Sequence, residues 1–304
     1  MMAIWCWVAA GSSKRIQYFA ALCVLWSLAA APLPLARFLS LCYARLFDRA
    51  LPRLRRIARV NLAFALAAKS EAERERIIDG VFRSIARLLV SFARFPQMNR
   101  KNISKWIRYE GLEHFEEALK RGKGVLFATA HLGNWELSAF AHGLMTAPMN
   151  VMVRPLDNPH VDALVESRRA LSGNRLIEKH EAARAVLQAL KRNEAVGVLI
   201  DQNAALAEGV FVSFFGVPAC AGTAFAKLAA HSGAAVIPGF ALWSEHERRY
   251  VLRFYPPVEI LGDAAADTQR IHSVFEGIIR EYPDQWLWIH RRWKTRPDGE
   301  PALY

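Results

Sequence analysis

The sequence lacks the motifs that most directly identify a nucleotide-binding protein, a serine hydrolase or a metalloprotease. No GxGxxG, GxxxxGK[S/T], GxSxG or HExxH pattern occurs among its 304 residues. Zinc-finger, helix-turn-helix and RNP-like patterns are missing too, and the histidines are scattered without metal-ligand spacing. We therefore expect no metal, no cofactor and no nucleic-acid partner.

Cysteine and acidic residues are both scarce. The four cysteines are Cys6, Cys23, Cys42 and Cys220, and none belongs to a CxxC pair, which indicates free thiols in a reducing compartment. The 28 acidic residues are outnumbered by 40 lysines and arginines, so the formal net charge is +12. A chain this basic favours an anionic partner, and without nucleic-acid motifs we expect that partner to be a membrane surface.

The longest stretch without charge runs from residue 16 to residue 36. Its length is near the minimum for a bilayer span, although Pro32 would interrupt a helix. Two basic residues precede the stretch and three alanines (29–31) resemble a cleavage site, so a signal peptide is a rival interpretation, and a buried core helix is another. We expect a membrane anchor in residues 1–40, with the basic residues that follow it on the cytoplasmic side.

Residues 41–105 are expected to be helical and basic. Between residues 41 and 66, apolar residues are interleaved with arginines, which is typical of a helix lying on anionic head groups. The alternative is an ordinary solvated basic face. Ser70 and Glu73 then form a capping box ahead of an amphipathic helix that continues to about residue 92.

From Trp106 onward, strand and helix patterns alternate. Short apolar runs predict strands at 125–129, 150–153, 195–200, 235–242 and 250–255. This alternation predicts an α/β fold with a mostly parallel or mixed central sheet flanked by helices. We expect residues 106–304 to form this α/β domain and to make one globular unit with residues 41–105.

Polar side chains follow three of the predicted strands. His131 follows the first strand, Arg154 the second, and Asp201 and Gln202 the third. The carboxyl ends of parallel strands share one rim of a sheet, where ligands bind. A single arginine at a strand end is usually a solvated loop residue, but three such groups indicate a shared site.

Within this site, His131 and Glu136 are a candidate catalytic pair. On a continuous helix they would point roughly 140° apart, at about 100° per residue. If His131 precedes the first turn, however, the carboxylate can fold back toward the imidazole ring. A carboxylate on one ring nitrogen leaves the other nitrogen free to take a proton from a hydroxyl group. The alternative is a structural histidine that makes its hydrogen bonds within the core, with Glu136 exposed at the surface.

Four blocks of sequence, taken together, suggest a family. They are His131-Leu-Gly-Asn-Trp-Glu136, residues 153–159 with Arg169 downstream, Asp201-Gln202 with residues 209–218, and residues 283–294. In this order they resemble the HxxxxD/E block and three later blocks of the bacterial lipid A biosynthesis (lauroyl/myristoyl) acyltransferases, in the lysophospholipid acyltransferase superfamily. Two stretches depart from the pattern. Residues 91–98 lack a common acidic residue, and residues 219–223 are smaller and less proline-rich, which puts the acceptor in doubt rather than the reaction.

The resemblance implies acyl transfer from an acyl-carrier-protein thioester to a hydroxyl group of a lipid A precursor, on the cytoplasmic side of a bacterial inner membrane rich in anionic lipids. It implies that His131 is the general base and that Glu136 orients it. The substrate-binding residues that it implies are Asn134, Arg154, Arg169, Asp201, Gln202, Gly216 and Thr223. Two alternatives stay open: the same chemistry on another glycolipid or a glycerolipid, and a non-catalytic membrane protein that binds anionic lipid.

Overall fold

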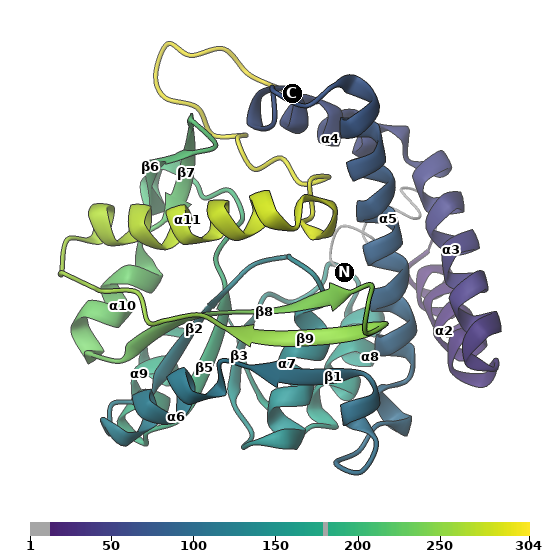
Figure 1. Cartoon of the computed structure of the whole chain (residues 1–304), viewed down its shortest axis with the longest axis horizontal. Helices are drawn as coiled ribbons and strands as arrows, with labels where there is room; N and C mark the ends of the chain where they lie inside the picture. The colour runs from purple at the N-terminus through teal and green to yellow at the C-terminus, as the bar shows by residue number, and fades with distance from the viewer. Residues whose placement is uncertain (1–12, 179–181) are drawn as a thin grey trace.

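A seven-stranded mixed β-sheet forms the centre of the protein (Figure 1). The computed structural model describes residues 13–178 and 182–304. The strand order is β1-β9-β8-β2-β5-β3-β4, in which β9 is antiparallel to β8 and the other neighbouring strands are parallel. The strands are β1 (Ile107–Glu110), β2 (Val125–Thr129), β3 (Asn150–Val153), β4 (Arg175–Glu178), β5 (Ala195–Leu199), β8 (Ala235–Ser244) and β9 (Arg249–Phe254). The expected mostly parallel or mixed sheet is therefore confirmed.

All five strands predicted from the sequence belong to this sheet. β2 and β5 are buried on both faces, which is why their sequences are continuous apolar runs. The prediction missed β1 and β4, which lie at the two edges of the sheet. It also missed a separate antiparallel hairpin of β6 (Gly209–Phe214) and β7 (Val217–Gly222).

Helices cover both faces of the sheet, as expected. Helices α6 (Leu112–Lys120), α7 (Trp135–Met145) and α8 (Pro159–Ala170) lie on one face, and α9 (Ala182–Lys191), α10 (Ala224–Ser232) and α11 (Ala264–Glu281) lie on the other. This division follows from right-handed crossovers between parallel strands. The chain thus leaves the neighbouring strands β2 and β5 toward opposite faces, which makes the rim between them a topological switch point.

Four N-terminal helices pack beside the sheet, on the right in Figure 1: α2 (Lys14–Ala30), α3 (Leu33–Ala50), α4 (Pro52–Ala65) and α5 (Glu71–Ala93). The uncharged stretch 16–36 was expected to form one anchor helix, but it is divided between α2 and α3. Ala31 is extended at the break, because a residue before proline avoids the helical region, and Pro32 is extended as the N-cap of α3. Within 13–178 and 182–304, no helix is both long enough and apolar enough to cross a membrane.

The predicted capping box at the start of α5 is confirmed. The Ser70 hydroxyl accepts a hydrogen bond from the backbone N–H of Glu73, and the Glu73 carboxylate accepts one from the backbone N–H of Ser70 at 2.8 Å. These contacts satisfy two donors at a helix end that otherwise lack partners. They start the long helix whose far end reaches the rim of the sheet.

Part of the basic face predicted for residues 41–66 is neutralised inside the protein. Arg55 on α4 forms ion pairs with Asp48, Glu75 and Asp79, and Arg59 pairs with Glu75. Hydrogen bonding to Asp48 raises the pKa of Arg55 above its usual value, against the opposing effect of burial. These two guanidinium groups join α4 to α3 and α5, so here the basic pattern has a structural role.

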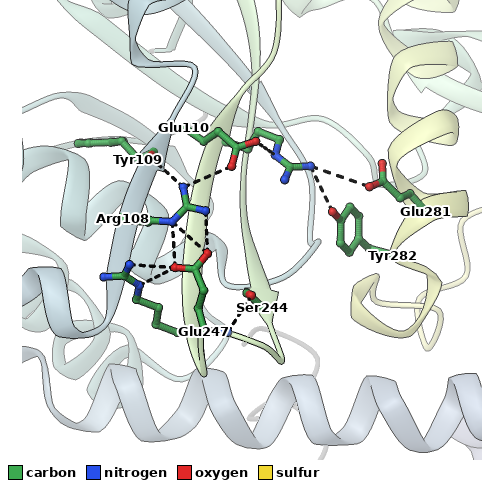
Figure 2. A network of polar contacts seen from close by, with 9 residues as sticks. Arg108, Tyr109, Glu110, Ser244, Glu247, Glu281 and Tyr282 are labelled. Atoms are coloured by element: carbon green, nitrogen blue, oxygen red, sulfur yellow. Dashed lines mark hydrogen bonds and ion pairs between the residues drawn. The ribbon is translucent and has the colours of Figure 1, made fainter.

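Ion pairs line the edge strand β1 (Figure 2). Arg108 pairs with Glu247 at 2.7 Å and with Glu110 at 3.3 Å, while Arg253 on β9 pairs with Glu110 at 2.7 Å. Edge strands expose unpaired backbone groups, and charged side chains discourage another strand from adding there. This network therefore protects the edge of the sheet farthest from β4.

The cysteines in the described residues are free, as expected. Cys23, Cys42 and Cys220 form no disulfide, and Cys220 is buried. Cys6 lies outside the described residues, as do residues 1–12 of the region 1–40 that was expected to hold the anchor.

Candidate active site

The register of two central strands brings His131 and Asp201 together. Thr129 and Leu199 are paired at the ends of β2 and β5, and each of the two polar residues lies two positions further along its strand. A hydrogen bond of 3.1 Å from the backbone N–H of Ile200 to the carbonyl of Thr129 continues the pairing beyond the strands. The two side chains therefore face each other at the switch point, on the rim where the sequence predicted a site.

Asp201 is held by three hydrogen bonds. Its Oδ1 lies 2.8 Å from Nδ1 of His131, and its Oδ2 accepts from the backbone N–H of His131 and from Nε1 of Trp286, both at 2.9 Å. Burial alone would raise the pKa of this carboxyl, but the hydrogen bonds from His131 and Trp286, together with the positive charge that His131 carries whenever it is protonated, hold it well below its usual range. The ionised carboxylate accepts the Nδ1 proton, so Nε2 of His131 presents a lone pair.

Glu136 does not occupy the place expected for it. The structure puts Asp201 on Nδ1 of His131, whereas the Glu136 carboxylate binds the Arg169 guanidinium through two hydrogen bonds of 2.6 and 2.9 Å. Burial raises the pKa of Glu136, but the charge and hydrogen bonds of Arg169 outweigh this and lower it overall. The reason is the early start of α7 at Trp135, which sets Glu136 within the first turn, beside α8.

Asn134 fixes the change from strand to helix before α7. Its side chain accepts from the backbone N–H of Leu137 at 3.0 Å and donates to the Ser91 hydroxyl of α5 at 2.7 Å. It is fully buried and is not among the residues that line the neighbouring cavity, so the structure places it as a helix cap rather than against substrate. Gly133 before it has a φ of 64°, and a Cβ there would lie 2.0 Å from the Ala241 carbonyl oxygen.

A cavity of about 1250 Å³ extends from His131 into the space between α7 and the sheet. One stripe of α7 forms a wall, with Trp135, Ala139 and His142 at helical spacing. From Trp135 to His142 this stripe is about 10 Å long, at 1.5 Å per residue. The sheet contributes a mainly apolar opposite wall that includes Phe127, Val151, Gly197, Leu199, Gly239 and Phe254.

The cavity also brings together several of the polar residues predicted for substrate binding. Arg154, Arg169, Gln202 and Thr223 all line it. The Arg154 side chain is exposed, and it has no hydrogen bond or ion pair with any of the described residues. Gly216 is different, because it lies in the exposed β6–β7 turn with a φ of 75°, away from the cavity-lining residues.

Two side chains contact the imidazole of His131 on the side away from Asp201. The amide nitrogen of Gln202 lies 3.4 Å from Nε2 of His131. The Trp135 ring meets the imidazole edge to face, with 5.0 Å between the ring centroids. The nitrogen with the lone pair therefore faces the cavity beside one polar and one aromatic group.

A buried cation lies behind the site. Arg292 is fully buried, donates to the carbonyl of Cys220 at 2.6 Å and lies over the Phe214 ring. Burial lowers the pKa of Arg292 to about 10, and the nearby Asp201 charge opposes this shift. Burial also lowers the pKa of His290 to about 4, so that side chain is neutral at pH 7. Asp201 is thus the balancing charge for Arg292 as well as the partner of His131.

Sequence reasoning missed the partners that act over long distances. Trp286 lies 85 residues from Asp201, and Arg169 lies 33 residues from Glu136. No local spacing predicts such pairs, since they depend on strand order and helix packing. The sequence held one weaker indication of these contacts. Trp286 and Arg169 both belong to the sequence blocks that resemble the acyltransferase family, and these blocks meet at one rim of the sheet.

Comparison with known proteins identifies the family of this chain. Residues 11–295 match a family model described as bacterial lipid A biosynthesis acyltransferase. The chain is similar to two proteins of Escherichia coli (strain K12), a lipid A biosynthesis lauroyltransferase (29% identical over 284 residues) and a palmitoleoyltransferase (31% over 285 residues), with 92% of both chains covered in each case. A myristoyltransferase of the same organism is 26% identical over 252 residues, covering 82% of this chain and 78% of the relative. The chain therefore belongs to the bacterial lipid A biosynthesis acyltransferase family, whose members are O-acyltransferases.

Proposed function

We propose that this protein transfers a fatty acyl chain from an acyl-carrier-protein thioester to a hydroxyl group of a lipid A precursor, at the cytoplasmic face of the bacterial inner membrane. The observation that carries the proposal is the imidazole of His131, fixed by the buried carboxylate of Asp201 at the head of a long, mainly apolar cavity. Family membership supports the reaction class and the acceptor.

The geometry suits general base catalysis by His131. Its Nε2 atom takes the proton of the acceptor hydroxyl as the oxygen attacks the thioester carbonyl, and the same proton then passes to the departing thiolate. Asp201 keeps the ring in the required tautomer and stabilises the imidazolium that forms. A carbon–oxygen bond forms and a carbon–sulfur bond breaks, so an ester and a free thiol result.

In this proposal Glu136 supports the site through Arg169. Their paired hydrogen bonds join the first turn of α7 to the last turn of α8, along the wall of the cavity. Because α7 begins directly after the loop that carries His131, this pair also holds the histidine loop in place. Glu136 therefore acts on the position of the base rather than on its protonation.

The cavity wall along α7 is suited to the acyl chain. Its lining beyond His131 is mainly hydrocarbon and aromatic, and a chain laid along α7 leaves water for an apolar surface. The far end is formed by Phe127, His142 and Phe254, whose rings pack against one another. Burial lowers the pKa of His142 to about 4, so this end carries no charge at neutral pH.

Arg154 is suited to bind a phosphate of the acceptor. Its guanidinium group is exposed at the cavity and unpaired within the described residues. Guanidinium groups form paired, charge-assisted hydrogen bonds with phosphate oxygens. An anionic head group bound there would share the cavity with His131, which supports an acceptor whose hydroxyl group reaches Nε2 of His131.

Apolar side chains exposed on α2 and α3 support a membrane location. They are Ile16, Phe19, Trp26, Leu35, Phe38 and Leu46, with exposed fractions from 48% to 70%. Exposed apolar surface gathered in this way is typical of helices that lie in a membrane interface. Asn158 donates to the carbonyl of Lys14 at 2.7 Å, which attaches the start of α2 to the loop that follows Arg154. The helix that carries part of this apolar surface thus begins beside the loop that follows Arg154.

The proposal is tested by mass spectrometry of lipid A and total lipids from cells with and without the protein, and from cells that carry His131→Ala. We expect one acyl chain to be missing from lipid A in both the deletion and the His131→Ala strain. A mass change in a different glycolipid or in a glycerolipid would show that the protein transfers an acyl chain, but to that lipid and not to a lipid A precursor. Unchanged lipids in the deletion strain would contradict acyl transfer and favour a non-catalytic membrane protein that binds anionic lipid.

A further inference from the structure

The side chain of Gln202 lies where the reacting atoms have to meet. It follows Asp201 directly after β5, it lines the cavity, and its Nε2 atom is 3.4 Å from Nε2 of His131. That separation is longer than a normal hydrogen bond, for which about 2.9–3.0 Å is typical. The amide therefore sits next to the base without being strongly bound to it.

The chemistry of His131 fixes which end of the amide faces it. The N–H at Nδ1 donates a hydrogen bond to the ionised Asp201, so Nε2 carries a lone pair. The amide oxygen of Gln202 would repel that lone pair, whereas the NH₂ group can face it. Gln202 thus presents hydrogen-bond donors at the head of the cavity.

Three backbone donors in the loop that carries His131 are already engaged. The N–H of His131 binds Asp201, the N–H of Gly133 binds the Gln285 carbonyl at 2.9 Å, and the N–H of Asn134 binds the Ala241 carbonyl, also at 2.9 Å. An acyl transfer reaction nevertheless needs a donor for the negative charge that develops on the carbonyl oxygen. In the described part of the chain, the Gln202 amide makes no hydrogen bond other than its long contact with His131.

We propose that Gln202 donates the hydrogen bond that stabilises the oxyanion of the tetrahedral intermediate, a step that rests on the proposed acyl transfer. The acceptor hydroxyl binds Nε2 of His131 and displaces the long amide contact. As its oxygen attacks the thioester carbon, the proton moves to Nε2 and the carbonyl electrons move onto the carbonyl oxygen. The freed NH₂ group of Gln202 donates to that oxygen until the carbon–sulfur bond breaks and the thiolate takes the proton back from His131.

This role predicts an effect on turnover rather than on binding. Removal of one oxyanion donor costs about 10²- to 10³-fold in kcat in enzymes of this mechanistic type. Because the donor acts on charge that develops during the reaction, the KM values of donor and acceptor stay nearly constant. A residue that only shaped the acceptor pocket would change the acceptor KM and leave kcat nearly intact.

The test compares Gln202→Ala and Gln202→Glu with the unaltered full-length protein and with His131→Ala, using an acyl-carrier-protein thioester and a lipid A precursor. The glutamate variant keeps the shape of the side chain but has no donor when ionised. We expect kcat to fall about 10²- to 10³-fold in both Gln202 variants, with KM values within about twofold and an unchanged melting temperature.

A raised acceptor KM with kcat preserved, or unaltered kinetics in Gln202→Glu, would overturn the role of Gln202. If His131→Ala abolishes turnover while both Gln202 variants keep it, only this inference fails. If the unaltered protein transfers no acyl chain, the proposed function fails instead.

Discussion

Nδ1 of His131 lies 2.8 Å from Oδ1 of Asp201, although 70 residues separate them in the sequence. The parallel pairing of β2 with β5 creates this contact, because the two strands end in register and each residue follows its strand by two positions. The pairing of the proposed base with its carboxylate partner is therefore a product of the sheet and not of one local motif. Glu136, whose carboxylate is nearer to His131 in the sequence, is bound to Arg169 instead.

Asp201→Asn should reduce turnover by about 10²- to 10⁴-fold. The amide NH₂ can turn toward Nδ1, which forces the proton onto Nε2 and removes the lone pair that accepts the substrate proton. Steady-state kinetics measures the effect, with circular dichroism and the melting temperature as controls for folding. A folded Asp201→Asn protein with unaltered turnover would show that Asp201 is not the partner of the base.

Glu136→Gln should mainly destabilise the protein. It leaves the charge of Arg169 without its partner in a mostly buried position, and breaking such a pair costs about 3–5 kcal/mol in the free energy of unfolding. The double variant Glu136→Gln/Arg169→Met should recover most of that loss, because no unpaired charge remains. Urea unfolding of the single variant, the double variant and the unaltered protein measures these free energies of unfolding. Normal stability combined with lost turnover in Glu136→Gln would instead assign Glu136 to the chemistry.

Stability should fall as the pH drops from 6.5 toward 4, in part because of His142. Burial lowers the pKa of His142 from its ordinary value of 6.5 to about 4, so the unfolded chain binds a proton more readily than the folded one. The stability this histidine contributes is complete above pH 6.5 and lost by pH 4, a change of roughly 3 kcal/mol.

His142→Phe removes that titrating group and suits a site surrounded by Phe115, Phe127 and Phe254. Urea midpoints at pH 7 and pH 4.5 should therefore differ less in His142→Phe than in the unaltered protein. The stability of His142→Phe should still fall somewhat at low pH, since burial also lowers the pKa of His272 to about 4. An equal drop in both proteins would show that His142 does not contribute to it.

Replacing Phe19, Trp26 and Phe38 together by serine should weaken binding to vesicles that contain anionic lipid. Transferring a large apolar side chain out of water is worth about 1.5–3 kcal/mol, so the loss should be many-fold. Leu261→Ser is a matched control, because Leu261 is also 61% exposed but lies just before α11. Vesicle sedimentation that does not distinguish the triple variant from this control would contradict a membrane role for α2 and α3.

Arg154→Ala should raise the KM of the acceptor about tenfold, which corresponds to about 1.4 kcal/mol, and should leave the melting temperature unchanged. Its guanidinium group is exposed and has no partner among the described residues, so its loss removes no internal contact. Arg192→Ala, on a surface arginine paired with Glu194, is the control for a general loss of positive charge. Equal acceptor KM values in the two variants would remove Arg154 from the site.

The central strands were predictable because burial on both faces of the sheet requires apolar residues at every position. Strands 125–129 and 195–200 match β2 and β5, since strands buried on both faces of a parallel sheet are apolar along their whole length. β1 and β4 were missed, because edge strands such as Ile107–Glu110 and Arg175–Glu178 mix charged and apolar residues within four positions. Short, half-exposed strands carry too little hydrophobic pattern to be distinguished from loops.

The rim was predictable from sequence, but the contacts across it were not. His131, Arg154 and Asp201 were expected at neighbouring strand ends, yet the pairing of His131 with Asp201 depends on β2 and β5 being adjacent. The division of the uncharged stretch between α2 and α3 was hidden for a related reason. Hydropathy along residues 16–36 does not reveal that Leu25 and Leu28 are buried in the protein, while Trp26 is exposed.

The most direct test of the central claim is the mass of the acceptor lipid after incubation with purified protein and an acyl-carrier-protein thioester. We predict that the unaltered protein adds one acyl chain to a lipid A precursor, and that His131→Ala does so at least about 10²-fold more slowly while remaining folded. A folded His131→Ala protein that acylates the precursor at the unaltered rate would contradict the assignment of His131 as the base.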